Sequence, residues 1–121
     1  MAEVERWLPS SVDGLEVSSL GRIRVVPYTK EMPHGGLRWY GGHAWFGNIA
    51  RDASRPRRVF RFRGNTHKVH RLVCEAFHGP EPLENADVLH RNGNTLDNVE
   101  ANLRWATRAE ILAQVPMEIA A

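Results

Sequence analysis

The sequence predicts an α+β fold in which a small N-terminal antiparallel sheet precedes a helix, a pair of strands and a final helix. In the first half of the chain, Gly and Pro interrupt short runs of β-branched and aromatic residues, which is typical of antiparallel strands and their turns. Residues 69–80 then change to a helical spacing of apolar side chains. Residues 86–106 return to two short strands around an Asn-Gly turn.

Two antiparallel hairpins are predicted in the first half of the chain. Residues 15–26, LEVSSLGRIRVV, predict two strands joined by a turn over Ser19–Gly21. Residues 28–36, YTKEMPHGG, predict a loop because they are rich in turn formers. Residues 37–47, LRWYGGHAWFG, place aromatic residues on both sides of Gly41-Gly42 and predict a hairpin that turns there.

The aromatic residues of that segment have two possible uses. They can fill the core of the small sheet, where aromatic side chains supply much of the buried area, and this is the use we expect. The alternative is that they stack on unpaired nucleic-acid bases. The four residues are Trp39, Tyr40, Trp45 and Phe46.

The next strand alternates in sequence from residue 57. Phe60 and Phe62 fall on one face, which we expect to be buried, and Arg61 and Arg63 fall on the other. Gly64-Asn65 is expected to turn the chain back.

A short amphipathic helix is predicted over VHRLVCEAFH, residues 69–78, and Gly79-Pro80 should stop it. Its single cysteine, Cys74, is expected in the core. After the strands ADVLH and NLRW, TRAE at Thr107 to Glu110 matches a capping box. A last helix should run from Arg108 to about residue 114, where Pro116 limits it.

The composition excludes several classes of protein. Apolar residues are 42% and charged residues 25% of the 121, which is ordinary for a soluble globular domain. The sequence has no apolar run long enough to span a membrane and no secretory leader at its N-terminus. One cysteine permits neither an internal disulfide nor a thiolate zinc cluster, so we expect a protein of a reducing, cytoplasmic compartment.

Positive charge is concentrated in one segment, although the net charge is only +2. Between residues 51 and 71 there is one acid, Asp52. Such a basic stripe is typical of proteins that bind a polyphosphate backbone. The alternative is a solvated strand edge that charge protects from aggregation. The basic residues are Arg51, Arg55, Arg57, Arg58, Arg61, Arg63, Lys68 and Arg71.

Three motifs resemble the HNH endonucleases of phages and mobile introns. GLEVSSLGRIRVV resembles their N-terminal motif YEVSxxGRVRS, and VHRLVCEAFHGP resembles the helix VHRLVAxAFxGP. VLHRNGNTLDNVEANLRW resembles VxHxDGNxxNNxxxNLxW. Together the motifs span about residues 7–114. The resemblance implies a ββα-metal core over residues 64–115 behind a β module at 1–63, joined as one unit, with a frayed tail at 116–121.

The resemblance also implies roles for individual residues. His90 would be the general base that takes a proton from the attacking water, a role suited to an imidazole. Asn102 would brace the loop and hold the orientation of that His, and Gly93 would occupy the turn. Read without the family, His90 beside an Asn-Gly turn is more often a surface residue, and Asn102 more often closes an Asx turn.

The metal ligands of the family are missing from this sequence. Relatives bind one divalent ion through the residue before the His, often Asp, and through a His or Asn nine residues after the Asn of NL. Leu89 and Ile111 stand at these positions, and neither has a lone pair for Mg²⁺. Asp87 and Glu110 are possible rescue ligands. We therefore expect no metal site and a catalytic His90 and Asn102 that are vestigial or weak.

DNA, expected to be double-stranded, would then be bound through phosphates, and Arg61 and Arg63 could also reach guanine edges. Two alternatives stay open: an active Mg²⁺-dependent nicking endonuclease, and a phage-encoded inhibitor that reuses the scaffold to bind a protein. No membrane partner is expected. The candidate DNA-binding residues are Arg22, Arg24, Arg55, Arg57, Arg58, Arg61, Arg63 and Lys68.

Overall fold

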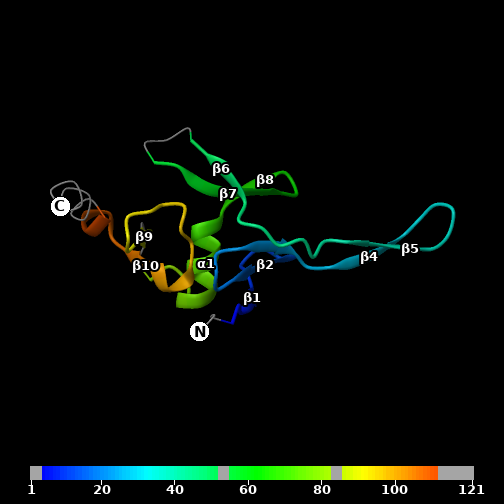
Figure 1. Ribbon diagram of the computed structural model, residues 1–121, viewed down its shortest axis with the longest axis horizontal. Helices are drawn as coiled ribbons and strands as arrows, with labels where there is room; N and C mark the ends of the chain where they lie inside the picture. Colours follow the sequence, from blue (N-terminus) through cyan, green and yellow to red (C-terminus); the bar gives the residue numbers. More distant parts are fainter. Residues whose placement is uncertain (1–3, 52–54, 83–85, 112–121) are drawn as a thin grey trace.

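The computed structural model describes residues 4–51, 55–82 and 86–111 (Figure 1). It is a strand-rich mixture of α and β structure, in agreement with the predicted class. The elements are β1 (Trp7–Pro9), β2 (Leu15–Ser18), β3 (Ile23–Val25), β4 (Tyr28–Glu31), β5 (Leu37–Tyr40), β6 (Asn48–Ala50), β7 (Arg57–Phe62), β8 (Asn65–Lys68), α1 (Val69–His78), β9 (Asp87–His90), the 3₁₀ turn η1 (Glu100–Asn102) and β10 (Leu103–Ala106).

All strand pairings in the described residues are antiparallel, and they form four small sheets. The sheets are β1-β2-β3, β4-β5, β6-β7-β8 and β9-β10. The helix α1 lies among them and packs against strands from three of the four sheets, while β4 and β5 reach away from it (Figure 1). None of the helices in the described ranges has the length and hydropathy that crossing a bilayer requires.

One hydrophobic core joins the two halves of the chain. Val17 of β2, Val73 of α1 and Leu103 of β10 are all fully buried in it. Because β2 precedes residue 63 and the other two elements follow it, the core crosses the predicted division at residues 63 and 64. That division falls in the turn between β7 and β8, which are paired strands of one sheet.

The structure confirms the predicted strands of residues 15–26 and the predicted helix. The helix α1 ends at His78, and Gly79 follows it with φ +87°. Cys74 is buried as expected, and burial raises the pKa of its thiol to about 12. Trp105 packs on the core, and its indole Nε1 donates a hydrogen bond of 2.8 Å to the carbonyl of Gly79. This bond ties β10 to the end of α1.

The predicted hairpin at Gly41-Gly42 is wrong. β5 pairs with β4, which lies in the segment expected to be a loop, and the turn between them falls before Leu37. A Cβ at Gly41 would lie 2.9 Å from the carbonyl oxygen of Val25, and the Gly42 amide donates to that same oxygen at 2.8 Å. The two glycines therefore let the chain pass close to the end of β3.

The predicted burial of the aromatic residues holds only in part. Trp45 forms an isolated antiparallel β-bridge with Ile23. Its ring packs on the core and lies edge-to-face against the ring of Phe60. Trp39 is 73% exposed and Phe46 is also exposed. Trp39 cannot reach the core because β5 extends away from it (Figure 1).

The strand β7 follows the predicted alternation up to its last residue. Phe60 and Phe62 pack against the core, and Arg61 is exposed. The turn comes one residue earlier than predicted, because Arg63 with φ +49° and Gly64 with φ +82° form it. Two positive φ values are typical of the type I′ turn that connects twisted strands. Arg63 therefore does not continue the face of Arg61, and its guanidinium lies 4.7 Å from the centre of the Phe62 ring.

The predicted capping box is confirmed. The Glu110 amide donates to Thr107 Oγ1 at 3.2 Å, and the Thr107 amide donates to Glu110 Oε1 at 3.1 Å. Helical residues begin at Arg108. The rest of the predicted final helix, its limit at Pro116 and the predicted frayed tail lie outside the described residues.

Candidate functional site

His90 lies at the end of β9 and is 7% exposed. Its Nε2 lies 2.9 Å from Asn98 Oδ1, and because an amide oxygen only accepts, this nitrogen carries the proton. The ring lone pair of the neutral imidazole is then on Nδ1. Burial lowers the pKa of His90, and the hydrogen bond that His90 donates to Asn98 acts in the opposite direction and raises it. His90 is thus held in one tautomer and favours the neutral state that a base requires.

Asn102 forms hydrogen bonds with residues 92 and 97, near the start and in the middle of the loop that follows His90. Its Oδ1 accepts from the Asn92 amide at 3.0 Å, and its Nδ2 donates to Asn92 Oδ1 at 3.0 Å and to the Asp97 carbonyl at 2.8 Å. Asp97 directly precedes Asn98, the partner of His90. The contact of Asn102 with His90 is therefore indirect and passes through the loop.

We expect Asn102→Ala to lower the free energy of unfolding by about 1–3 kcal/mol, because it leaves the partly buried Asp97 carbonyl and the Asn92 amide without these partners. Urea denaturation measures this change. Asn102→Asp is the matched variant, since it keeps the acceptor for the Asn92 amide and removes the donor to Asp97. An unfolding free energy equal to that of the unaltered chain in both variants would show that the loop does not depend on Asn102.

The turn between β2 and β3 supports the same loop. The Glu100 amide donates to the Ser19 carbonyl at 2.9 Å. Gly21 has φ +88°, and a Cβ there would lie 2.7 Å from the backbone carbonyl of Asn98. Only glycine permits this approach, so the N-terminal motif and the residue that holds His90 are in direct contact.

A second buried histidine, His70, was missed by the sequence interpretation. Its ring stands edge-to-face on that of His90, with 5.5 Å between centroids. Its Nδ1 is buried and has no hydrogen-bond partner, and burial lowers the pKa of His70 to about 4. The sequence carried a signal for it, because His70 stands three and four residues before Val73 and Cys74 on the apolar face of the helix.

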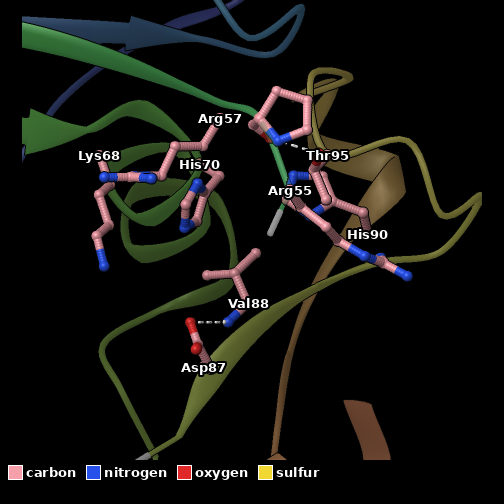
Figure 2. A pocket seen from close by; sticks show the side chains of 9 residues that line it. Arg55, Arg57, Lys68, His70, Asp87, Val88, His90 and Thr95 are labelled. Carbon is pink, nitrogen blue, oxygen red and sulfur yellow. Dashed lines mark hydrogen bonds between the residues drawn. The ribbon is translucent and has the colours of Figure 1, made fainter. Parts of the chain in front are cut away.

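The two histidines line a pocket of about 410 Å³, called here the His90 pocket (Figure 2). A hydrogen bond from Thr95 Oγ1 to the Pro56 carbonyl joins the His90 loop to the segment before β7 on one side of it. The pocket thus combines two buried imidazoles with cations from a neighbouring sheet. Its polar and charged lining includes Arg55, Arg57, Lys68, His70, Asp87 and His90.

The residues at the positions where the HNH endonucleases that the sequence resembles bind their ion do not fit a divalent cation. Leu89 is 6% exposed and does not line the His90 pocket, and Ile111 is also apolar. Within the described residues, no group of three His, Cys, Asp or Glu side chains could hold a metal ion. A hard cation such as Mg²⁺ needs several oxygen ligands.

The carboxylates of the two possible rescue ligands already accept hydrogen bonds from other groups of the protein. Glu110 Oε1 accepts from Thr107, and its Oε2 lies 3.1 Å from Arg104 Nη1, so both carboxylate oxygens are engaged. The hydrogen bonds from Thr107 and Arg104 lower the pKa of Glu110. Asp87 does line the His90 pocket, but its Oδ1 accepts from the Val88 amide at 2.9 Å. One carboxylate without further oxygen ligands is a poor magnesium site.

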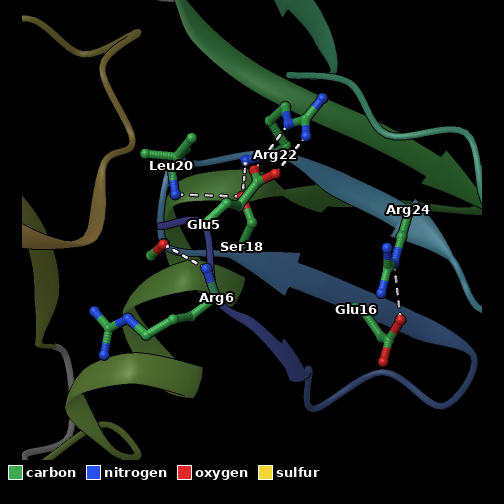
Figure 3. Close-up of polar contacts among 8 residues, drawn as sticks. Glu5, Arg6, Glu16, Ser18, Leu20, Arg22 and Arg24 are labelled. Atoms are coloured by element: carbon green, nitrogen blue, oxygen red, sulfur yellow. Dashed lines mark hydrogen bonds and ion pairs between the residues drawn. The ribbon is translucent and has the colours of Figure 1, made fainter. Parts of the chain in front are cut away.

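Two of the predicted DNA-binding arginines, Arg22 and Arg24, are occupied within the first sheet (Figure 3). Arg22 binds Glu5 through two nitrogens, and this pairing lowers the pKa of the carboxyl. Arg24 Nε lies 2.9 Å from Glu16, and its guanidinium lies 3.9 Å from the centre of the Trp7 ring. These two cations stabilise their own sheet.

The other predicted DNA-binding cations divide into three groups. Arg58 donates to the Gly47 carbonyl at 3.1 Å, and Arg63 covers Phe62, so both contact the protein itself. Arg61 is exposed on β7. Arg55, Arg57 and Lys68 line the His90 pocket, and they are the predicted cations that the structure brings together with His90.

Comparisons with known proteins agree with this arrangement. Residues 67–113, which include both pocket histidines and Asn102, match the family model described as HNH endonuclease. A solved structure described as "DNA binding and cleavage by the HNH homing endonuclease I-HmuI" is similar, with a TM-score of 0.53 and 22% sequence identity. The match covers 98% of this chain and 60% of that one, so it shows a shared fold over part of the larger protein. No curated protein matches the chain.

Proposed function

From the match of residues 67–113 to the HNH endonuclease family model, we propose that the chain is a DNA-binding protein in which metal-dependent cleavage is weakened or lost. The observation that carries the proposal is the pocket itself. It keeps the buried His90 and three cations, while the positions that hold the ion in relatives are Leu89 and Ile111.

The His90 pocket suits a phosphate of the DNA backbone. Arg57 of β7 and Lys68 of β8 belong to the Arg-rich sheet and face the pocket with Arg55. Guanidinium and ammonium groups neutralise phosphate without reading sequence. The buried histidines favour their neutral forms, so they add no charge to the repulsion among the cations. The N–H of His90 is already donated to Asn98, so of the two histidines only His70 can offer an N–H to a phosphate.

Loss of the ion would leave His90 with little to activate. A divalent ion stabilises the leaving oxygen by several kcal/mol, and each 1.36 kcal/mol is a tenfold change in rate. Without an ion or an acid to stabilise it, the leaving oxygen of a phosphodiester departs as an alkoxide, so a base alone gives slow hydrolysis. For this reason we propose DNA binding, and not DNA cleavage, as the main activity.

Salt dependence of duplex binding tests the proposal. We expect the affinity for a duplex to fall steeply as salt rises, with a log–log slope of roughly −0.9 per phosphate contact. Arg57→Gln with Lys68→Gln should reduce the size of that slope by about 1.8 and weaken binding to all sequences alike. Fluorescence anisotropy over a salt series measures both quantities.

Arg24→Gln is the matched control, because that arginine is already paired with Glu16. It should leave the slope unchanged. A chain that binds no duplex at low salt would contradict the proposal and favour the alternative of a protein-binding inhibitor. Plasmid nicking that needs Mg²⁺ and disappears in His90→Ala would favour the active nicking endonuclease.

A further inference from the structure

The hairpin of β4 and β5 projects away from α1 (Figure 1) and is called here the arm. Its register gives it two faces with different side chains. Side chains alternate along each strand, so directly paired residues share a face. Tyr28 pairs with Tyr40 and Lys30 with Arg38, and these four lie on one face. Trp39, paired with Thr29, lies on the other.

The tyrosine face carries paired aromatic rings beside paired cations. The rings of Tyr28 and Tyr40 stack with 5.4 Å between centroids and an angle of 15° between planes, and Tyr28 is 50% exposed. The Arg38 guanidinium lies 5.4 Å from the centre of the Tyr40 ring. Lys30 stands directly opposite Arg38. Like charges at directly paired positions repel, so an anion bound between them would stabilise the arm.

A hollow of about 510 Å³ opens where the arm joins the body, and we call it the tyrosine hollow. Its lining includes Tyr28, Tyr40, Phe62 and Arg63, and none of its lining residues is acidic. The volume lies within the range of small-ligand sites, roughly 300–1,000 Å³. The hollow shares no lining residue with the His90 pocket.

We propose that the tyrosine face and the tyrosine hollow together bind single-stranded nucleic acid. An unpaired base stacks against the tyrosine pair in the hollow, and the phosphates that follow it pair with Lys30 and Arg38. Single-stranded nucleic acid fits because stacking on a tyrosine needs an open base face. In a duplex the neighbouring base pairs cover those faces. An acidic protein segment would match the cations but would leave the aromatic hollow without a planar partner.

The test compares an oligothymidine of about twelve nucleotides with an oligomer of equal length built of abasic residues, which has the same charge and no bases. We expect the unaltered chain to bind the oligothymidine about tenfold or more tightly than the abasic oligomer. Tyr28→Leu with Tyr40→Leu should abolish that preference, whereas Tyr28→Phe with Tyr40→Phe should keep it. Lys30→Gln with Arg38→Gln should reduce the size of the salt slope by about 1.4.

Trp39→Ala is the matched control, because it removes an exposed aromatic ring from the opposite face of the same arm. It should bind like the unaltered chain. Equal affinity for the two oligomers, or a preference that survives the Leu variant, would overturn the proposal. A preference that only Trp39→Ala removes would also overturn it. The affinity for a duplex should be the same in the Leu variant as in the unaltered chain. A failure of single-strand binding by the arm can therefore be told apart from a failure of duplex binding at the His90 pocket.

Discussion

Replacing Leu89 with Asp and Ile111 with Asn is expected to give a protein that nicks plasmid DNA in Mg²⁺ at least about a thousandfold faster than the unaltered chain. The two substitutions place oxygen ligands at the positions that hold the ion in the family that the sequence resembles. His90 is already held by Asn98 in one tautomer with its lone pair on Nδ1. On the proposal that cleavage is weakened by loss of the ion, restoring the ion ligands is therefore expected to restore cleavage.

The same double variant with His90→Ala is the control for this gain, and it should nick no faster than the unaltered chain. Leu89 is buried, so a carboxylate there destabilises the fold until an ion binds it. Thermal melting of the double variant with and without Mg²⁺ therefore reports the new site independently of cleavage. Chelator-sensitive nicking by the unaltered chain at the rate of the double variant would show that its own residues suffice.

The stability of the chain is expected to fall by about 3 kcal/mol between pH 6.5 and pH 4 through His70 alone. The unfolded imidazole has an ordinary pKa of 6.5, and burial lowers the pKa of the folded group to about 4. Between these values the unfolded state binds more protons than the folded state. The contribution is therefore complete above pH 6.5 and is lost as the pH falls toward 4.

Urea denaturation across this pH range measures the effect, and His70→Leu should remove most of it. Burial also lowers the pKa of His90, so a smaller dependence of the same sign should remain. His34→Gln, at an exposed position, is the control and should leave the pH dependence as it is. A pH profile that is the same in His70→Leu would show that His70 is not buried in its neutral form.

Elements with strong local signals could be predicted from the sequence. The helix α1 has an apolar period and a Gly-Pro stop, and β9 and β10 flank an Asn-Gly turn. The capping box depends only on Thr107 and Glu110, which are three residues apart. Each of these structures is decided within a few neighbouring residues, so no knowledge of the remaining chain was needed.

Elements decided by distant contacts could not be predicted in the same way. The glycines at 41 and 42 are a hairpin signal locally, yet their conformation serves a close approach to Val25. The exposure of Trp39 follows from the direction of the arm, which the sequence pattern does not contain. For the candidate site, His90 and Asn102 were found through the motif, whereas His70 and Asn98 gain their importance only from the packing of α1 and the loop.

The contact of Gly21 with Asn98 has a consequence for how this protein can diverge. Any larger residue at position 21 would displace Asn98, the residue that orients the imidazole, although the two positions are 77 residues apart in the sequence. A fragment that began after the β7–β8 turn would lose this support, and it would expose Val73 and Leu103 to water where Val17 now covers the same core. The amino-terminal motif and the carboxy-terminal loop thus depend on each other for their conformation, and a side chain at position 21 would disturb both.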